Sequence, residues 1–77
     1  MKTEYEYIEF SPLVATGKTS KWLCRNRNDG DSGALGEVKW YGAWRQYCYF
    51  PTVQAVYSSG CLNDIMDFLK QLNTKNK

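Results

Sequence analysis

The chain has 77 residues, carries ten Lys and Arg against eight Asp and Glu, and contains no histidine. A chain of this length builds one modest core and leaves no room for the deep, rigid cavity that most enzymes use. The missing histidine also removes the commonest acid–base group and the commonest metal ligand. We therefore expect a single domain over residues 1–77, with no catalytic activity and no cofactor.

The composition is that of a folded protein with many aromatic side chains. Hydrophobic residues make up 43% and aromatic residues 16% of the chain, so some rings must lie at the surface of so small a domain. The three cysteines, at 24, 48 and 61, have no paired spacing and predict free thiols, with neither disulfide nor zinc site. No apolar run is long enough for a membrane span, and no export signal is seen, so we expect a cytoplasmic protein without a membrane partner.

Four segments have the alternation and the aromatic, β-favouring residues that predict strands. They are residues 4–10, 20–27, 35–41 and 44–50. Ser11 and Pro12 are expected to end the first strand, Gly42 and Ala43 to form a tight hairpin turn, and Pro51 to end the fourth. Residues 28–33 are dense in turn formers, and a short extended piece is expected at 53–57.

An amphipathic helix is predicted after Ser58 or Ser59, either of which can cap its start. Its apolar stripe is expected to comprise Leu62, Ile65, Met66, Leu69 and Leu72. Residues 1–3 and 73–77 are expected to fray. The predicted fold class is α+β, with a four-stranded antiparallel sheet and one C-terminal helix packed on one face.

The face of the sheet that the helix leaves open is the candidate binding surface. Alternation predicts that the helix covers Trp22, Cys24, Val38, Trp40, Cys48 and Phe50. The opposite face is then predicted to carry Arg25, Arg27, Lys39, Tyr41, Arg45, Tyr47 and Tyr49. Glu37 would be its only acid, and a bulge at Gly36 would move part of this assignment to the other face.

Interleaved cations and tyrosines are compatible with several roles. Guanidinium groups bind phosphates and tyrosine rings stack on bases, which favours a nucleic acid or nucleotide. The same residue types are enriched at the centres of protein–protein interfaces, including those of homodimers. They can also simply cover the exposed side of a small sheet. A thiol enzyme using Cys61 at the helix start would need a base, and the chain has no histidine to supply it.

Two sequence motifs carry a resemblance to known proteins. Residues 35–51 contain Lys-Trp-Tyr, then Trp-Arg-Gln-Tyr, then Phe-Pro, and a Cys-Leu-Asn-Asp-Ile run opens at Cys61. This pattern resembles a group of small proteins of phages, prophages and mobile elements, over roughly residues 20–72.

The resemblance implies a phage accessory protein, and such proteins often bind and block a host component. It therefore implies a stoichiometric inhibitor of a host protein or protein–nucleic-acid complex, such as a CRISPR or other immune complex. The alternative is a nucleic-acid or nucleotide binding module that uses the Arg/Tyr-rich face.

Overall fold

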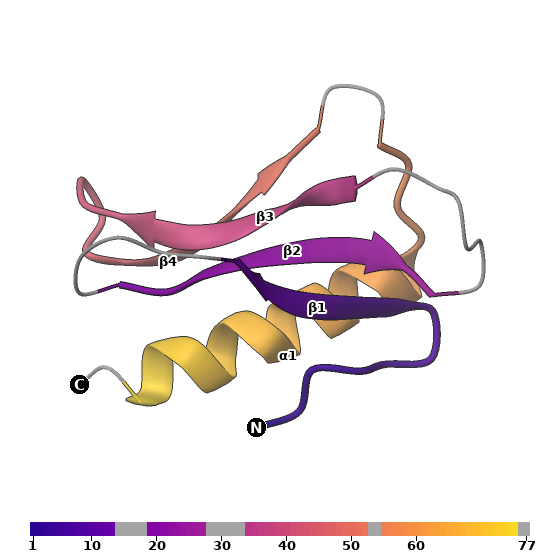
Figure 1. Cartoon of the computed structure of the whole chain (residues 1–77), viewed down its shortest axis with the longest axis horizontal. Helices are drawn as coiled ribbons and strands as arrows, with labels where there is room; N and C mark the ends of the chain where they lie inside the picture. Colours follow the sequence, from indigo (N-terminus) through magenta and orange to yellow (C-terminus); the bar gives the residue numbers. More distant parts are fainter. Residues whose placement is uncertain (14–18, 28–33, 53–54, 76–77) are drawn as a thin grey trace.

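Four antiparallel strands and one helix make up the regular structure of the described residues. The computed structural model describes residues 1–13, 19–27, 34–52 and 55–75. The strands are β1 (Ile8–Leu13), β2 (Lys21–Asn26), β3 (Ala34–Tyr41) and β4 (Gln46–Pro51), and they lie in the order β1-β2-β3-β4. The helix α1 (Ser59–Lys75) packs across one face of this sheet (Figure 1). The predicted α+β class is confirmed.

The first strand begins later than predicted and includes its proline. The N–H of Phe10 donates to the carbonyl of Thr3 at 2.8 Å, on the side away from β2. Backbone groups of alternate residues point to the same side, so Pro12 also faces away from β2, opposite Trp22. Its missing N–H therefore removes no bond from the ladder, which is why an edge strand accepts a proline that the sequence pattern treats as a terminator.

The segment before β1 folds back instead of extending the strand. The N–H of Tyr5 donates to the carbonyl of Ile8 at 2.9 Å, and Glu4 forms an isolated bridge with Glu9. The main chain of Lys2 exchanges two hydrogen bonds with the side-chain amide of Gln71, at 2.8 and 2.9 Å. The N-terminal segment thus lies along the outer side of β1 and next to α1 (Figure 1).

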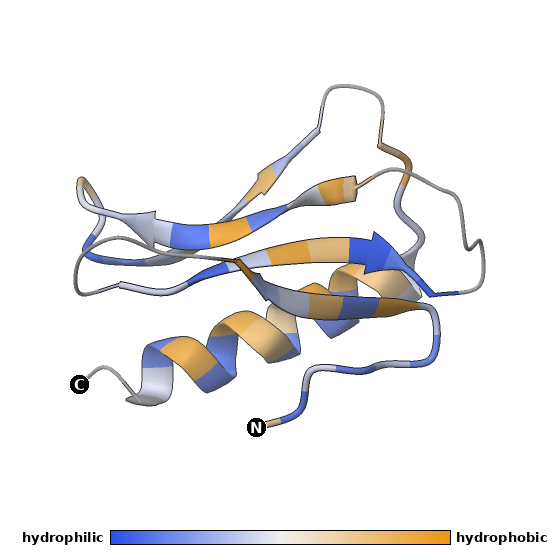
Figure 2. Ribbon diagram, viewed as in Figure 1, coloured by the Kyte–Doolittle hydropathy of each residue, from blue (hydrophilic) through white to orange (hydrophobic). Residues whose placement is uncertain are grey.

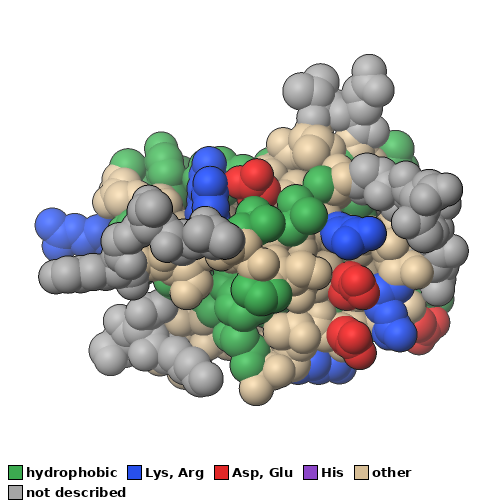
Figure 3. Space-filling view, viewed as in Figure 1, with side chains coloured by type: hydrophobic (Ala, Val, Ile, Leu, Met, Phe, Trp, Pro, Cys, Tyr) green, Lys and Arg blue, Asp and Glu red, His purple; other side chains and the backbone are tan. Residues whose placement is uncertain are grey.

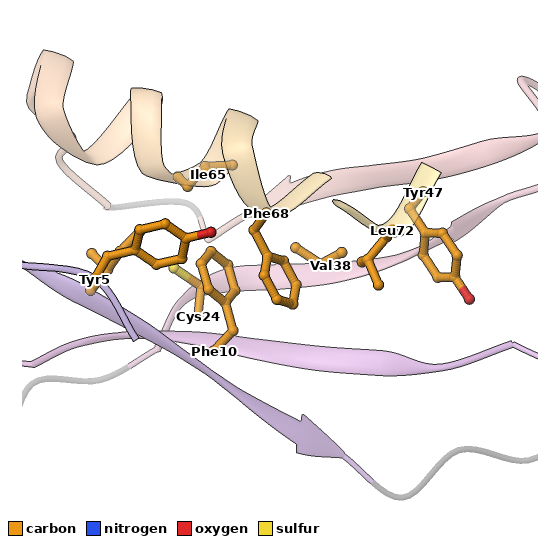
Figure 4. Close-up of a cluster of buried hydrophobic side chains, with 9 residues drawn as sticks. Tyr5, Phe10, Cys24, Val38, Tyr47, Ile65, Phe68 and Leu72 are labelled. Carbon is orange, nitrogen blue, oxygen red and sulfur yellow. The ribbon is translucent and has the colours of Figure 1, made fainter. Parts of the chain in front are cut away.

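The core lies between the sheet and the helix, and Phe68 is at its centre. Phe68 is fully buried, and its ring stacks on that of Phe10 with centroids 4.0 Å apart. Figure 4 shows Phe68 pointing from α1 toward the sheet and lying against Phe10. Of the side chains predicted under the helix, Cys24 and Val38 are fully buried, and Trp22 and Trp40 pack against the same core.

The helix is rotated relative to the predicted apolar stripe. Leu62 and Met66, expected in the core, are 53% and 56% exposed. The side chains that α1 places against the core are Cys61, Ile65, Phe68, Leu69 and Leu72. Figure 2 shows hydrophobic and hydrophilic residues alternating along the helix. The observed stripe is centred on the large ring of Phe68. The predicted stripe did not include Phe68 and was therefore centred on a different side of the helix.

Ser58 caps the start of α1, and the other end of the helix lies beyond the predicted one. The hydroxyl of Ser58 accepts a hydrogen bond from the N–H of Cys61 at 3.2 Å, so Ser58 is the N-cap, as predicted. At the other end, the helix continues through Lys75, three residues beyond the predicted stripe. Asn73, expected in a polar tail, is therefore helical.

The fourth strand presents the opposite faces from those predicted. It begins at Gln46, which pairs with Tyr41, so the hairpin loop comprises residues 42–45 instead of Gly42 and Ala43 alone. Directly opposed residues of antiparallel strands share a face. When the loop has an even number of residues, the residues just before and just after it are directly opposed, as Tyr41 and Gln46 are here. Cys48 and Phe50 therefore share the face of Tyr41, and the assignment of these two side chains to the core is wrong.

A bulge lies beside Gly36, the position at which the sequence analysis considered one. Cys24 pairs with Gly36 and Arg25 pairs with Ala34, so Leu35 is the extra residue of β3. Gly36 itself stays on the helix face and is buried. Of the other predicted segments, residues 28–33 and 53–54 lie outside the described residues, and residues 55–57 form no strand.

The buried hydroxyl and thiol groups predict a loss of stability in alkali. Burial raises the pKa of Cys24 to about 11 and raises the pKa of Tyr49 and Tyr57 above the ordinary tyrosine value. When the pKa of an acid is higher in the folded than in the unfolded state, its neutral form contributes fully to stability below the pKa of the unfolded state. This contribution to the free energy of unfolding is lost as the pH rises through the pKa of the folded state.

For Cys24 alone, we expect the free energy of unfolding to fall between about pH 9 and pH 11, by up to about 1.4 kcal/mol per pH unit. Urea unfolding of the wild type and Cys24→Ala from pH 7 to 11 measures this slope. Cys24→Ala should be less stable at every pH but should decline less steeply from pH 8.5 to 9.5. Equal slopes in that window would contradict the prediction.

Candidate protein-binding surface

The predicted binding residues separate onto two faces of the sheet. Arg25, Lys39 and Tyr41 lie on the face turned away from α1, which we call the open face. Its other members include Glu9, Lys21, Leu23, Glu37, Gln46, Cys48 and Phe50. Arg45 is exposed in the hairpin loop. Arg27 follows β2, and its guanidinium donates to the carbonyl of Tyr5 at 2.7 Å.

Tyr47 was predicted on the open face and lies on the helix face instead. It is only 6% exposed, and its ring meets Trp40 edge-on with centroids 5.4 Å apart. Its N–H donates to Oδ1 of Asn73 at 2.7 Å, and its carbonyl accepts from Nδ2 of Asn73 at 3.2 Å. Its hydroxyl accepts from the N–H of Ser20 at 3.1 Å. Tyr47 therefore joins the sheet to α1 and presents no ring on the open face.

Tyr49 is also on the helix face, because it stands directly opposite the buried Val38 in the register, so its predicted placement on the open face is wrong. Its hydroxyl lies 2.8 Å from the hydroxyl of Tyr57, which in turn donates to the carbonyl of Leu35. A Cβ added to Gly36 would lie 2.5 Å from the Tyr49 hydroxyl, so the ring rests directly on the glycine. Tyr49 thus packs against the core on the helix face, next to Tyr57, and presents no ring on the open face.

Acids lie beside two of the cations on the open face, while Lys39 stands directly opposite Lys21. The Lys21 ammonium lies 3.9 Å from the Glu37 carboxylate, and Glu9 stands directly opposite Arg25 in the register. Glu37 is therefore not the only acid there. Figure 3 shows acidic and basic side chains next to one another on the visible side of the molecule. Among the described residues of the open face, carboxylates thus stand between the cations and weaken its attraction for phosphates.

Three aromatic side chains gather where the β3–β4 hairpin meets the open face. The Tyr41 ring packs edge-on against Trp44, with centroids 5.2 Å apart, and against Phe50, with centroids 5.9 Å apart. Trp44 is 67% exposed, and the Lys39 ammonium lies 4.6 Å from the Phe50 ring centroid. We call Tyr41, Trp44 and Phe50 the hairpin cluster. The sequence predicted only Tyr41, although an even loop length already implied that Phe50 shares its face.

A groove of about 570 Å³ lies between β4 and the C-terminal half of α1. Its lining residues are Trp44, Gln46, Tyr47, Cys48, Tyr49, Met66, Leu69, Lys70, Asn73 and Thr74. Trp44 belongs to both the groove and the hairpin cluster, so the two features form one continuous surface. Met66, exposed because of the rotation of α1, contributes the apolar wall on the helix side.

Groups for metal binding or membrane insertion are not found in the described part of the chain. Within residues 1–13, 19–27, 34–52 and 55–75, no group of three or more Cys, Asp or Glu could hold a metal ion. None of the helical structure described there is long and apolar enough to cross a membrane. The three cysteines are free thiols, with Cys24 buried.

Comparison with known proteins places the chain in a phage family. No protein-family model matches it, and no solved structure matches it. It is 32% identical over 72 residues to a protein of Acholeplasma phage L2 described as an "Uncharacterized 9.3 kDa protein". The match covers 94% of this chain and 91% of that protein, so it includes the sheet, the hairpin cluster and the helix. The chain belongs to the same family as this small phage protein.

Proposed function

We propose that the chain is a non-enzymatic phage accessory protein that binds a host protein through the hairpin cluster. The observation that carries this proposal is the exposure of Trp44, 67%, in a side chain that nevertheless packs against Tyr41. Trp and Tyr are the residue types most enriched at the energetic centres of protein interfaces. A large exposed aromatic group surrounded by polar residues marks an interaction site in a small domain.

The cluster is ordered before any partner arrives. The N–H of Trp44 donates to the carbonyl of Tyr41 at 3.2 Å, and that of Arg45 to the carbonyl of Gly42 at 3.3 Å. The edge-on contacts of Tyr41 with both neighbours restrict their rotation further. A surface held in its bound arrangement loses less conformational entropy on association, which favours tight binding.

These features support inhibition by binding, in which the chain covers a surface that the target protein needs. A binder without catalytic groups acts in proportion to the amount of target that it covers, which makes it a stoichiometric inhibitor. A phage-encoded chain meets host proteins in the infected cell, and host defence complexes are a target class consistent with the resemblance to small phage proteins.

Nucleic acid is a weaker candidate for the partner. Of the three tyrosines expected to stack on bases, Tyr47 and Tyr49 pack under α1, and only Tyr41 is on the open face. Two cations of the open face, Arg25 and Lys21, stand beside Glu9 and Glu37. The hairpin cluster offers aromatic area with Lys39 as its neighbouring cation, which suits a protein surface better than a run of phosphates.

The proposal predicts that Trp44→Ala weakens partner binding by about 30-fold or more, the effect of losing a hot spot of about 2 kcal/mol. The tagged chain is incubated with a nuclease-treated lysate of the cells in which the phage grows. The captured protein is then purified and titrated calorimetrically against each variant. Leu62→Ala, which removes a 53% exposed apolar side chain from α1, is the matched control and should change affinity less than twofold.

Two results would overturn the proposal. One is a partner that binds Trp44→Ala and Tyr41→Ala as tightly as it binds the wild type. The other is capture of nucleic acid alone, lost at high salt, because that behaviour belongs to phosphate contacts.

A further inference from the structure

We propose that the outer edge of β4 and the adjoining groove bind an extended peptide segment that presents a carboxylate to Lys70. This inference rests on the proposed function, because it names the part of a protein partner that the surface would take. It is carried by three features of the described residues: the unpaired N–H and carbonyl of Tyr49 at the strand edge, an apolar groove beside them, and one charged side chain lining that groove.

The free edge of β4 is centred on Tyr49. Backbone groups of alternate residues in an edge strand point outward, and the bonds of Tyr47 to Asn73 show that the odd-numbered residues of β4 do so. Asn73 already satisfies Tyr47, and Pro51 has no N–H to donate. Within the described residues, no bond is found from the outward N–H and carbonyl of Tyr49 to a group outside the sheet. These two groups form a site for pairing with an added strand.

The position of Asn73 limits which strand can be added. Its side-chain amide donates to and accepts from Tyr47, as a residue of a neighbouring strand would, and so it blocks that end of the edge. In a second copy paired about Tyr49, each Pro51 would face a Tyr47 whose groups are already bonded. A homodimer would therefore gain only the Tyr49 pair, whereas a short peptide can end beside Asn73.

The groove gives the peptide a place for one side chain. Successive side chains of an extended segment point to opposite sides, so one of them faces the groove when the main chain pairs with Tyr49. The groove wall there includes Trp44, Leu69 and the 56% exposed Met66. An apolar residue of the partner would cover this wall and remove it from water.

Charge selects a carboxylate as the accompanying group. Among the residues that the structure describes, Lys70 is the only charged side chain that lines the groove. The neighbouring acid Asp67 faces the other side of α1, where its carboxylate accepts from the Tyr5 hydroxyl at 2.7 Å. Lys70 lies one helical turn before Asn73, at the end of the edge where an added peptide stops. The carboxylate can belong to an acidic side chain or to the C-terminus of the segment.

Two display libraries of random seven-residue peptides test this inference and separate the two sources of the carboxylate. One library ends in a free C-terminal carboxylate, and in the other the peptide continues into the carrier protein. Each library is selected on the folded chain, and selected peptides are synthesised and titrated. We expect selected peptides to combine an apolar residue with a carboxylate and to lose at least tenfold in affinity on Lys70→Glu and on Met66→Ser.

The matched control variants are Arg25→Glu and Leu62→Ala, which alter one cation and one exposed apolar side chain outside both the groove and the hairpin cluster and should leave peptide affinity unchanged. All four positions lie at the surface or partly exposed, so these variants should fold. In 15N-labelled protein, peptide addition should shift the amide resonance of Tyr49 and slow its hydrogen exchange, as pairing at the edge requires.

The inference is overturned if no peptide is enriched, if selected peptides lack a carboxylate, or if they bind Lys70→Glu as tightly as the wild type. An unchanged Tyr49 amide would overturn it as well. If a captured host protein loses affinity with Trp44→Ala but not with Lys70→Glu or Met66→Ser, the groove inference fails while the proposed function stands. If selected peptides bind as expected but no host protein is captured, the groove inference stands and the proposed function fails.

Discussion

Replacing Phe68 with alanine is expected to lower the free energy of unfolding by about 3–5 kcal/mol, the cost of deleting a fully buried ring. Phe68 stacks on Phe10 with centroids 4.0 Å apart and meets Trp22 edge-on at 5.2 Å. No other ring of α1 reaches the sheet, so its removal leaves a cavity at the centre of the core. A domain of this size is stable by only about 3–5 kcal/mol, so a large fraction of Phe68→Ala molecules should be unfolded at 25 °C.

Urea unfolding followed by tryptophan fluorescence measures this effect, with Met66→Ala as the matched control on the same helix. Met66 is 56% exposed, and its truncation should change stability by no more than about 0.5 kcal/mol. The pair also tests the rotation of α1, because the predicted apolar stripe included Met66 and left out Phe68. A larger loss for Met66→Ala than for Phe68→Ala would show that the helix presents a different side to the sheet.

Gly36→Ala is expected to destabilise the fold by about 1–3 kcal/mol, as overpacking of a close contact does. A Cβ at this position would lie 2.5 Å from the Tyr49 hydroxyl and 2.7 Å from the main-chain oxygen of Phe50. The tyrosine can turn away, but the Phe50 carbonyl is held in the ladder with Glu37. The added methyl group therefore pushes β4 away from β3 and disturbs the strand that carries the groove edge.

Two further variants make the Gly36 prediction specific. Gly42→Ala is the matched control, because nothing lies within 4 Å of a Cβ there, and it should be nearly neutral. Tyr49→Phe in the Gly36→Ala background removes the nearest atom but leaves the ring carbon Cζ at 2.6 Å and the Phe50 oxygen at 2.7 Å, so it should recover only a small part of the loss. Thermal unfolding of the four proteins provides the comparison. Wild-type stability in Gly36→Ala would mean that β3 and β4 do not approach as closely as described.

Local signals were enough to predict the elements of the fold. Alternation located the strands, the serine before the apolar run gave the N-cap, and the single amphipathic segment gave the helix. The boundaries that moved did so through long-range contacts. Pro12 stays in β1 because its nitrogen faces away from β2, and residues before Ile8 turn back because Thr3 and Lys2 find partners on Phe10 and Gln71.

The faces of β4 could have been predicted from turn geometry but not from hydrophobicity. Cys48 and Phe50 are more apolar than Tyr47 and Tyr49, yet the tyrosines are on the helix face. Their hydroxyl groups find partners in Ser20 and Tyr57, which allows both side chains to be buried. A two-residue or a four-residue loop both put Phe50 on the face of Tyr41, so loop parity is the better guide here.

The candidate site was predicted only in part for the same reason. Tyr41, Arg25 and Lys39 lie on the open face as expected, whereas Trp44 and Phe50 were missed. The groove could not be inferred from the sequence, because it depends on how α1 crosses β4 and on which of its side chains are turned outward. Asn73, which closes one end of the β4 edge, looked like part of a polar tail.

Both functional proposals depend on the orientation of β4, and a NOESY spectrum of the uniformly 13C,15N-labelled chain tests it most directly. The structure predicts contacts between the Tyr47 amide and the Asn73 side-chain amide, between the Tyr49 and Tyr57 rings, and between the Phe50 ring and the Lys39 side chain. Contacts from Cys48 and Phe50 to Phe68, with Tyr47 and Tyr49 near Lys39, would place the tyrosines on the open face and contradict the account.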